Sequence, residues 1–219
     1  MSLATAAPTL RDGAAALGVS LSDTQADQLL AYGSLILKWN KVYNLTALRD
    51  PASVLTHHLL DSLAVVAPLQ RETAKRQWPK VRLLDVGSGA GLPGVVIAIL
   101  CPDIDVTCLD AVAKKMAFVQ QCAAELKLPN LRAQHTRIET LVGTYQVVCS
   151  RAFASLADFV NGSAQVVADD GVWLAMKGKA PDEELAELPA RAEVFHVEQL
   201  HVPGLDAERC IVWLRHAAA

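Results

Sequence analysis

One stretch of the sequence limits the possible folds more than any other, and it reads VRLLDVGSGAGLPGVVIAIL over residues 81–100. Its first part is a run of Val and Leu typical of a strand that is buried on both faces. Gly87, Gly89 and Gly91 follow at every second position, where a side chain would prevent a tight turn or the close approach of a ligand. Residues 92–100 predict an apolar helix whose free N–H groups point back into the turn. The turn should therefore hold an anionic or hydrogen-bonding group of a cofactor.

The spacing of the glycines indicates which cofactor. A dinucleotide fingerprint requires G-x-G-x-x-G, but Leu92 occupies the third glycine position, and Asp85 stands two residues ahead of the first glycine. This string resembles the first motif of the S-adenosylmethionine-dependent methyltransferases of the doubly wound α/β class. A second predicted strand, 105–109, is followed by Asp110, an acid placed to accept hydrogen bonds from both ribose hydroxyls. A nicotinamide or flavin site, or a related fold without a cofactor, are the alternatives.

Composition excludes several classes of protein. The chain has 219 residues, 52% of them hydrophobic and 20% charged, which suits one α/β domain with an extension. Its formal net charge is −3, so a role with nucleic acid would depend on a local basic patch. The five cysteines form no C-x-x-C pair and predict reduced core residues in a cytoplasmic protein. The longest apolar run, 95–101, is too short to cross a bilayer, so neither export nor membrane insertion is expected.

The N-terminal third predicts helices. Ser22 and Gln25 form a capping-box pattern ahead of an apolar face with helical spacing. Asp50 and Pro51 are a cap and first-turn pair for another helix, which we expect to end at Pro68. Residues 1–75 should form a helical cap on the rest of the chain.

The remainder, residues 76–219, predicts a catalytic domain in which strands and helices alternate, as a parallel sheet requires. The expected fold class is α/β, a doubly wound, mainly parallel sheet with an N-terminal helical extension. After the second strand the expected elements are a helix at 112–126, strands at 131–134 and 145–149, a helix at 153–168, a strand at 172–176, an acidic helix at 182–188, and two antiparallel strands at 194–202 and 210–214.

Two polar clusters stand outside the glycine turn. His57 and Asp61 lie four residues apart on the second helix, whereas the adjacent His58 points about 100° away, which argues against a shared metal. A structural His–Asp contact and a substrate-facing role both stay open. The segment 71–82 has five basic residues and one acidic residue around Trp78. It is either a solvated surface or a contact for a phosphate backbone.

Five strings together match one family closely. They are WNKVYNLTALRDP at 39–51, HHLLDSL at 57–63, DVGSGAGLPG at 85–94, SRAFASL at 150–156 and MKGK at 176–179. The chain resembles the bacterial 16S ribosomal RNA guanine-N7 methyltransferase family, also called methyltransferase G or glucose-inhibited division protein B, over about residues 25–215.

The resemblance implies a class I methyltransferase that moves a methyl group from S-adenosylmethionine to N7 of one guanine in the decoding-region loop of 16S rRNA. By the family pattern, Gly87 and Leu92 line the cofactor site. Ile138 and Glu139 hold the adenine, and Arg151 closes the pocket. From the wider fold, Gly89 of the same turn and Asp110 are expected to bind the cofactor as well.

The chemistry restricts the substrate side. An arginine forked onto guanine O6 and N7 would block the lone pair that must react, so Arg151 should hold the methionine carboxylate, a phosphate, or O6 alone. A salt bridge to an interior acid such as Asp85 is the alternative for Arg151. Lys177 is a candidate for an RNA phosphate, and His58 and Asn44 are further candidates for the substrate side.

Guanine N7 carries a free lone pair, so the reaction requires no general base and no catalytic residue is assigned; positioning supplies the catalysis. No metal is expected. The N7 edge faces a deep groove in folded RNA, so the target base should be exposed or flipped out. We expect a cytoplasmic monomer that acts on the small subunit or an assembly intermediate. A methyltransferase of another RNA or a small molecule, a scaffold that only binds the cofactor, and a dehydrogenase are the competing interpretations.

Overall fold

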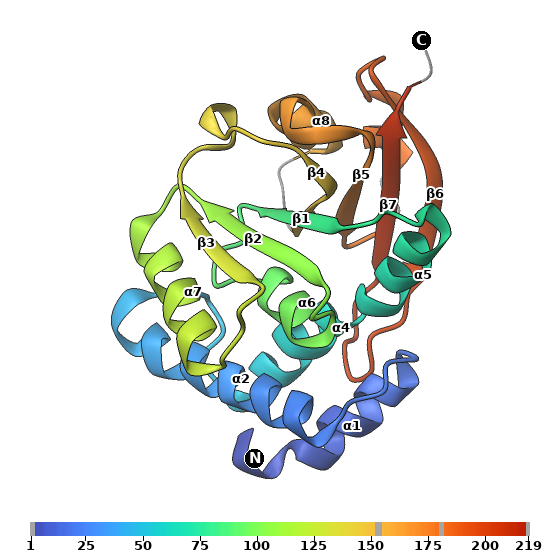
Figure 1. Cartoon of the computed structure of the whole chain (residues 1–219). Helices are drawn as coiled ribbons and strands as arrows, with labels where there is room; N and C mark the ends of the chain where they lie inside the picture. The colour runs from blue at the N-terminus through green and yellow to red at the C-terminus, as the bar shows by residue number, and fades with distance from the viewer. Residues whose placement is uncertain (1–2, 152–154, 180–181, 218–219) are drawn as a thin grey trace.

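The computed structural model describes residues 3–151, 155–179 and 182–217, and its centre is a seven-stranded sheet with the order β3-β2-β1-β4-β5-β7-β6 (Figure 1). Strands β1 to β5 run parallel, β7 runs antiparallel to β5, and β6 runs antiparallel to β7. The doubly wound, mainly parallel sheet is confirmed. The strands are β1 Val81–Val86, β2 Ile104–Asp110, β3 Leu131–His135, β4 Tyr145–Arg151, β5 Val167–Lys177, β6 Ala192–Leu200 and β7 Arg209–His216.

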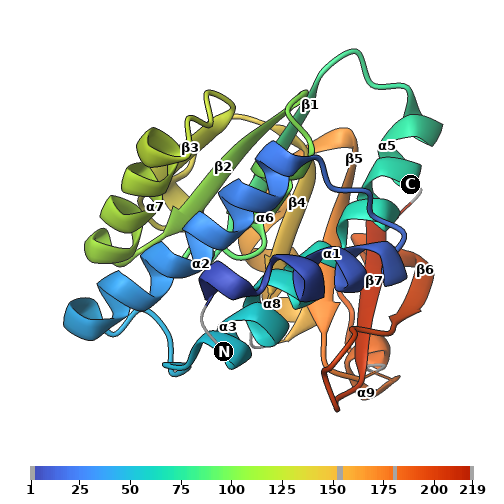
Figure 2. The ribbon, with the colours of Figure 1, turned by 90° about the horizontal axis from the view of Figure 1, so that it is seen from below.

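Helices cover both faces of this sheet (Figures 1 and 2). Helices α6 and α7 lie on one face with α2 packed across them, and α8 lies on the other. The α-helices are α1 Ala7–Ala16, α2 Asp23–Tyr43, α3 Pro51–Val54, α4 Asp61–Leu63, α5 Val66–Arg76, α6 Gly94–Leu100, α7 Ala113–Glu125, α8 Leu156–Ser163 and α9 Asp182–Ala186, and a π-helical segment, Leu55–Leu60, joins α3 to α4.

The hydrophobic core is divided by the sheet. Leu10 of α1 and Tyr32 of α2 belong to the same buried cluster as Leu83 of β1. A smaller cluster under α8 contains Phe159 and Trp173. The N-terminal helices therefore share a core with the sheet, and the division of the chain at residue 75 stays a prediction.

The predicted start of α2 is confirmed at atomic detail. Ser22 Oγ accepts the Gln25 N–H at 3.2 Å, and Gln25 Oε1 accepts the Ser22 N–H at 3.0 Å. This reciprocal capping satisfies two N–H groups that have no partner inside the helix.

Two predicted boundaries are wrong. Pro68 does not end a helix but lies in the first turn of α5, where a missing N–H leaves no helical hydrogen bond unmade. The helix expected over 153–168 is α8, Leu156–Ser163, and a 3₁₀ turn and β5 take up the residues after it. Phe153 lies outside the described residues. The short apolar run after Ser163, VVA at 166–168, fits both a helix and a strand, so the sequence pattern misplaced this boundary.

One helical run, Pro51–Arg76, is long and apolar enough to cross a membrane by length and composition alone. Within the protein, 72% of its most apolar window is buried. Most of the apolar side chains in this window are therefore part of the protein core.

Candidate functional site

The carboxyl ends of the parallel strands lie along one edge of the sheet. Val86, Asp110, His135, Arg151 and Lys177 are the last residues of the five parallel strands. Strand β1 lies between β2 and β4, so the chain order changes direction across β1. In open α/β sheets, ligands bind outside the carboxyl ends of the strands at such a switch point.

The glycine turn leaves β1 and keeps open space beside it. Gly87 and Gly89 have φ angles of 66° and 60°, and a Cβ added at either would meet nothing within 4 Å. Leu92 is buried, and its N–H donates to Ser88 O at 3.0 Å, so Leu92 closes the turn from inside. The buried Tyr32 hydroxyl of α2 donates to Ala90 O at 2.7 Å and ties the turn to α2. The turn is therefore fixed while one of its sides stays available to a ligand.

Asp85 anchors the helix that follows the turn. Its Oδ2 accepts the Gly94 N–H at 2.8 Å, and a Cβ on residue 94 would lie 2.8 Å from the same oxygen. Burial raises the pKa of Asp85 to about 7, although the Gly94 N–H and the charge of Arg151 act in the opposite direction. Only glycine fits at residue 94 without moving this carboxyl.

Asp110 is tied to the same turn. Its Oδ2 accepts the Gly89 N–H at 3.1 Å and its Oδ1 accepts the Val112 N–H at 2.9 Å. Lys115 Nζ lies 3.2 Å from Oδ2. These contacts place the carboxylate at the end of β2, facing the glycine turn.

A cavity of about 260 Å³ opens beside this carboxylate. It brings together four of the seven predicted cofactor residues, Gly87, Asp110, Ile138 and Glu139, whereas Gly89, Leu92 and Arg151 are not among its lining residues. The cavity is lined by Val86, Gly87, Leu109, Asp110, Ala111, Thr136, Arg137, Ile138 and Glu139.

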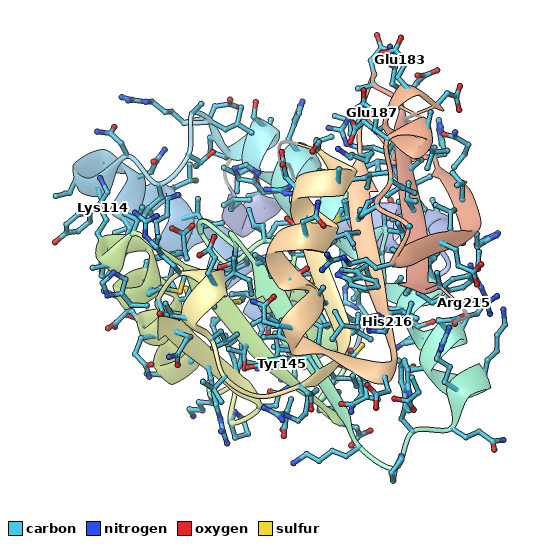
Figure 3. All side chains as sticks on the ribbon, turned by 90° about the horizontal axis from the view of Figure 1, so that it is seen from above. Lys114, Tyr145, Glu183, Glu187, Arg215 and His216 are labelled. Carbon is cyan, nitrogen blue, oxygen red and sulfur yellow. The ribbon has the colours of Figure 1, made fainter. Side chains whose placement is uncertain are left out.

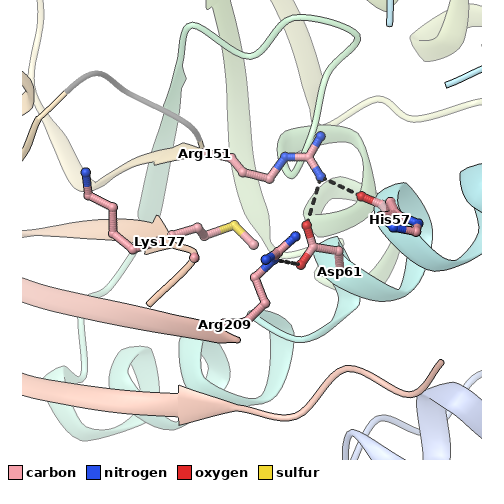
Figure 4. Close-up of a pocket in the computed structure, with 7 residues that line it drawn as sticks. His57, Asp61, Arg151, Lys177 and Arg209 are labelled. Carbon is pink, nitrogen blue, oxygen red and sulfur yellow. Dashed lines mark hydrogen bonds and ion pairs between the residues drawn. The ribbon is translucent and has the colours of Figure 1, made fainter. Parts of the chain in front are cut away.

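A second cavity, of about 410 Å³, lies at the same edge of the sheet (Figure 4). Asp61 of α4 binds two arginines there: Arg151 Nη1 lies 3.2 Å from Oδ2, and Arg209 Nε lies 2.8 Å from Oδ1. Arg151 thus pairs with Asp61, not with Asp85. The cavity is lined by His57, Asp61, Arg151, Met176, Lys177, Gly178 and Arg209.

The π-helical segment explains how His57 takes part. The Asp61 N–H donates to Thr56 O, five residues back, and to His58 O. In a regular α-helix it would donate to His57 O, four residues back. Here the His57 carbonyl instead accepts Arg151 Nη1 at 3.0 Å (Figure 4). His57 therefore contributes its backbone carbonyl to a group of contacts with Asp61, Arg151 and Arg209, here named the Asp61 cluster.

The other substrate-side candidates have partners within the protein. His58 is buried, its Nε2 lies 2.8 Å from Thr46 Oγ1, and burial lowers its pKa to about 4, so its ring is neutral at pH 7. Asn44 ends α2 with φ 49°, and its Oδ1 accepts Arg49 Nη2 at 3.1 Å. Their role toward a substrate stays a prediction.

Lys177 lies at the carboxyl end of β5 and lines the larger cavity. Its Nζ lies 2.7 Å and 2.9 Å from the two carboxylate oxygens of Glu184 on α9. Figure 4 shows its side chain extending away from Asp61.

The basic segment 71–82 lies at the opposite edge of the sheet, where β1 begins. Three of its five basic residues pair with acids: Arg71 with Glu198 at 2.5 Å, Arg76 with Glu72 at 2.6 Å, and Lys80 with Asp105 at 2.7 Å. Trp78 Nε1 donates to an Asp170 carboxylate oxygen at 2.7 Å. The arrangement favours a solvated surface over a phosphate contact.

Sequence reasoning missed Arg209 and Met176. Arg209 begins β7, and the amino end of an antiparallel strand lies at the edge where its parallel neighbours end. The predicted strand at 210–214 carried this signal, because the residue just before it must face the carboxyl edge. All five cysteines are free and buried, as predicted. Among the described residues, no group of three or more His, Cys, Asp or Glu side chains is placed to hold a metal ion.

Comparison with known proteins agrees with this architecture. The family described as rRNA small subunit methyltransferase G matches residues 25–212. The ribosomal RNA small subunit methyltransferase G of a Polaromonas species is 63% identical over 96% of this chain and 93% of its own length. The corresponding Acidovorax protein is 62% identical over 95% of each chain.

A solved structure shares the fold at much lower identity. TrmN from Thermus thermophilus superimposes with a TM-score of 0.58 at 16% identity, covering 74% of this chain and 53% of TrmN. The sequence matches over most of the chain decide the family. This chain belongs to the rRNA small subunit methyltransferase G family.

Proposed function

We propose that this chain transfers a methyl group from S-adenosylmethionine to N7 of one guanine in 16S rRNA of the small ribosomal subunit. One observation carries the proposal: Gly87, Asp110, Ile138 and Glu139 line a single cavity at the switch point of the sheet, in a chain of this family. The target guanine in the decoding-region loop follows from the resemblance of the sequence motifs.

The cavity suits the cofactor chemically. Open space beside Gly87 admits a group close to the backbone, and the Asp110 carboxylate is positioned to accept ribose hydroxyls. Leu109 and Ile138 supply apolar surface for a purine ring, and Glu139 adds polar atoms at its edge. When bound, the cofactor supplies an electrophilic methyl group on a sulfonium sulfur.

The protein's own residues have positioning to perform, not proton transfer. Guanine N7 has a free lone pair, so no side chain has to remove a proton from it before the attack. Holding two reactants in line is worth effective molarities of roughly 10⁵ M or more. Fixed elements such as the glycine turn and the Asp61 cluster supply this kind of rigidity.

Arg151 fits this role without blocking the reaction. Its guanidinium is held by the His57 carbonyl and Asp61, so it does not turn freely toward a base. A fork on guanine O6 and N7 would occupy the reacting lone pair. We assign Arg151 to the methionine carboxylate of the cofactor.

The acceptor is the small ribosomal subunit or an assembly intermediate. The chain has a net charge of −3, so charge alone would not hold naked RNA, and an assembled particle adds recognition by shape. The target base must be exposed or flipped out to offer its N7 edge. A monomeric protein in the cytoplasm suits this substrate.

The test is methyl transfer from labelled S-adenosylmethionine to small subunits that lack the modification, followed by digestion and identification of the labelled base. Label at N7 of one guanine supports the proposal. Label on a different base, or on a small molecule but not on the RNA, would replace it with another methyltransferase activity.

A matched pair of variants links the activity to the cavity. Gly87 and Gly18 both have positive φ, 66° and 71°, with nothing within 4 Å of an added Cβ. Alanine at either position costs about 1–2 kcal/mol of backbone strain. We expect Gly87→Ala to lose cofactor binding measured by calorimetry and Gly18→Ala to keep it. Equal binding by both variants would contradict the assignment of the cavity.

A further inference from the structure

The cavity of about 410 Å³ holds more positive than negative charge. The side chain of Asp61 is only 5% exposed and binds both Arg151 and Arg209. Lys177 is balanced separately by Glu184. Among the residues that line the cavity, one positive charge is therefore left over beside Asp61, where the side chains of Arg151 and Arg209 are only 20% and 24% exposed.

Both arginines also keep donors that have no partner among the described residues. Arg209 uses Nε for Asp61 and Nη1 for the Glu208 carbonyl at 2.8 Å, which leaves Nη2. Arg151 uses only Nη1, for Asp61 and the His57 carbonyl. Guanidinium donors lie in a fixed plane that matches the oxygens of a phosphate or carboxylate. An excess positive charge and free donors in one cavity call for an anion.

We propose that Arg209 binds a phosphate of the RNA strand that carries the target guanine, and that Asp61 is the positioning residue that holds Arg209 and Arg151 together at this cavity. The inference rests on the proposed function, since it names an RNA contact of the same site.

The topology separates the tasks of the two arginines. Arg151 follows Cys149 by two residues on β4, and Cys149 pairs with Asp85 on β1, so Arg151 ends level with Gly87 of the glycine turn. Arg209 begins β7, which β5 separates from β4. Arg151 therefore lies on the strand next to β1, and Arg209 lies one strand beyond β5, farther from the cavity beside Asp110.

RNA is the anion that suits the outer position. Each nucleotide brings one phosphate, so a strand that presents a guanine to the cofactor carries phosphates within reach of the same edge of the sheet. Contacts of this kind fix register and orientation, and they make binding depend on salt. A cavity of this size also lies within the usual range of about 300–1,000 Å³ for ligand sites.

The experiment compares Arg209→Gln with Arg215→Gln. Arg215 lies on the same strand and pairs with Glu193 at 2.6 Å. Figure 3 shows Arg215 well apart from Glu183 of α9, and Arg215 pairs with Val172 of β5, five residues before Lys177 at the carboxyl edge. The probe is the small ribosomal subunit without the modification. The three quantities measured are its KM, the salt dependence of its binding, and the Kd of S-adenosylmethionine.

We expect Arg209→Gln to raise the KM for the subunit roughly tenfold and to lower the slope of log K against log salt by about 0.7, with the cofactor Kd unchanged. Arg209→Lys should keep most of the slope, because it keeps the charge. Arg215→Gln should change none of the three quantities. Arg151→Gln should weaken the binding of S-adenosylmethionine, and Asp61→Asn should weaken the binding of both S-adenosylmethionine and the small subunit.

Two results would overturn the inference. Equal salt slopes for Arg209→Gln and Arg215→Gln would remove the phosphate contact. A raised cofactor Kd in Arg209→Gln, with an unchanged slope, would assign the anion to the cofactor's carboxylate. In both cases the wild-type protein still methylates the subunit, whereas failure of the proposed function would show as a wild-type protein that transfers no methyl group to this RNA.

Discussion

The two edges of the sheet use positive charge in opposite ways. At the amino edge, the segment 71–82 has the densest run of basic residues in the chain, yet Arg71 and Lys80 each meet an acid on a neighbouring element. At the carboxyl edge, Arg151 and Arg209 come from strands far apart in sequence and share one carboxylate. Most of the charge that is dense along the chain is paired with acids in space, whereas charge that is scattered along the chain accumulates at the cavity around Asp61.

Mutations in the basic segment 71–82 are expected to have little effect on activity. If the segment 71–82 bound RNA, reversing its charge would lower the activity of the protein on an RNA substrate. Because the segment lies at the opposite edge from the cavity beside Asp110 and the cavity around Asp61, an unchanged activity is expected for an RNA substrate as well. The variants that discriminate must be placed at the carboxyl edge.

The largest effect should come from removing the shared carboxylate. Asp61→Asn leaves two partly buried arginines without a counter-charge, so we expect the free energy of unfolding to fall by about 3 kcal/mol and kcat/KM to fall roughly tenfold. Urea unfolding and methyl transfer to small subunits measure the two quantities.

The matched control is Asp105→Asn at the amino edge, where the carboxylate pairs with Lys80 and is 41% exposed. An exposed pair of this kind contributes under about 0.5 kcal/mol. Similar losses of stability in the two variants would mean that the paired carboxylates at the two edges stabilise the protein equally.

A smaller effect should appear as a dependence on pH. Burial raises the pKa of Asp85 from 3.8 to about 7, so folding takes up a proton between these values. The stabilising contribution is complete at low pH and is lost as the pH rises through 7. Between about pH 5 and about pH 8 we expect the free energy of unfolding to fall by roughly 2 kcal/mol on this account.

Urea unfolding of wild type and Asp85→Asn at the two pH values measures this difference. The variant should lack most of the fall, because its amide does not titrate, while Asp105→Asn should keep the wild-type dependence. A fall of the same size in Asp85→Asn would assign the pH dependence to another group.

The smallest effect is expected in the basic segment itself. Arg71 and Lys80 have side chains 53% and 66% exposed, so glutamine at either position should change the free energy of unfolding by less than about 0.5 kcal/mol. Neither variant should alter the salt slope for subunit binding. A lower slope in Lys80→Gln would show that the RNA reaches the amino edge too.

The sequence predicted the parts of this molecule that depend on local pattern. The strand at 81–86, the glycine turn and Asp110 follow from spacing and strand order, and the cavity beside Asp110 is built from them. Short-range patterns failed at Pro68, because a proline in the first turn and a proline after the last turn look alike in sequence.

The larger cavity was less predictable for a physical reason. The sequence placed Arg151 at a strand end, but its partner depends on how the π-helical segment sets Asp61 and the His57 carbonyl. Arg209 depends in addition on the antiparallel direction of β7. Contacts between residues far apart in the sequence can be predicted only when the order and direction of the strands are known.

The ion pair between Asp61 and Arg209 can form only late in the synthesis of the chain. The two residues are 148 positions apart in the chain, and Arg209 opens the last strand of the sheet. A growing chain has already made the glycine turn, Asp110 and Arg151 by the time residue 209 is added. The cavity beside Asp110 can therefore form while the larger cavity still lacks one wall, and Asp61 gains its second arginine only after residue 209 has been added.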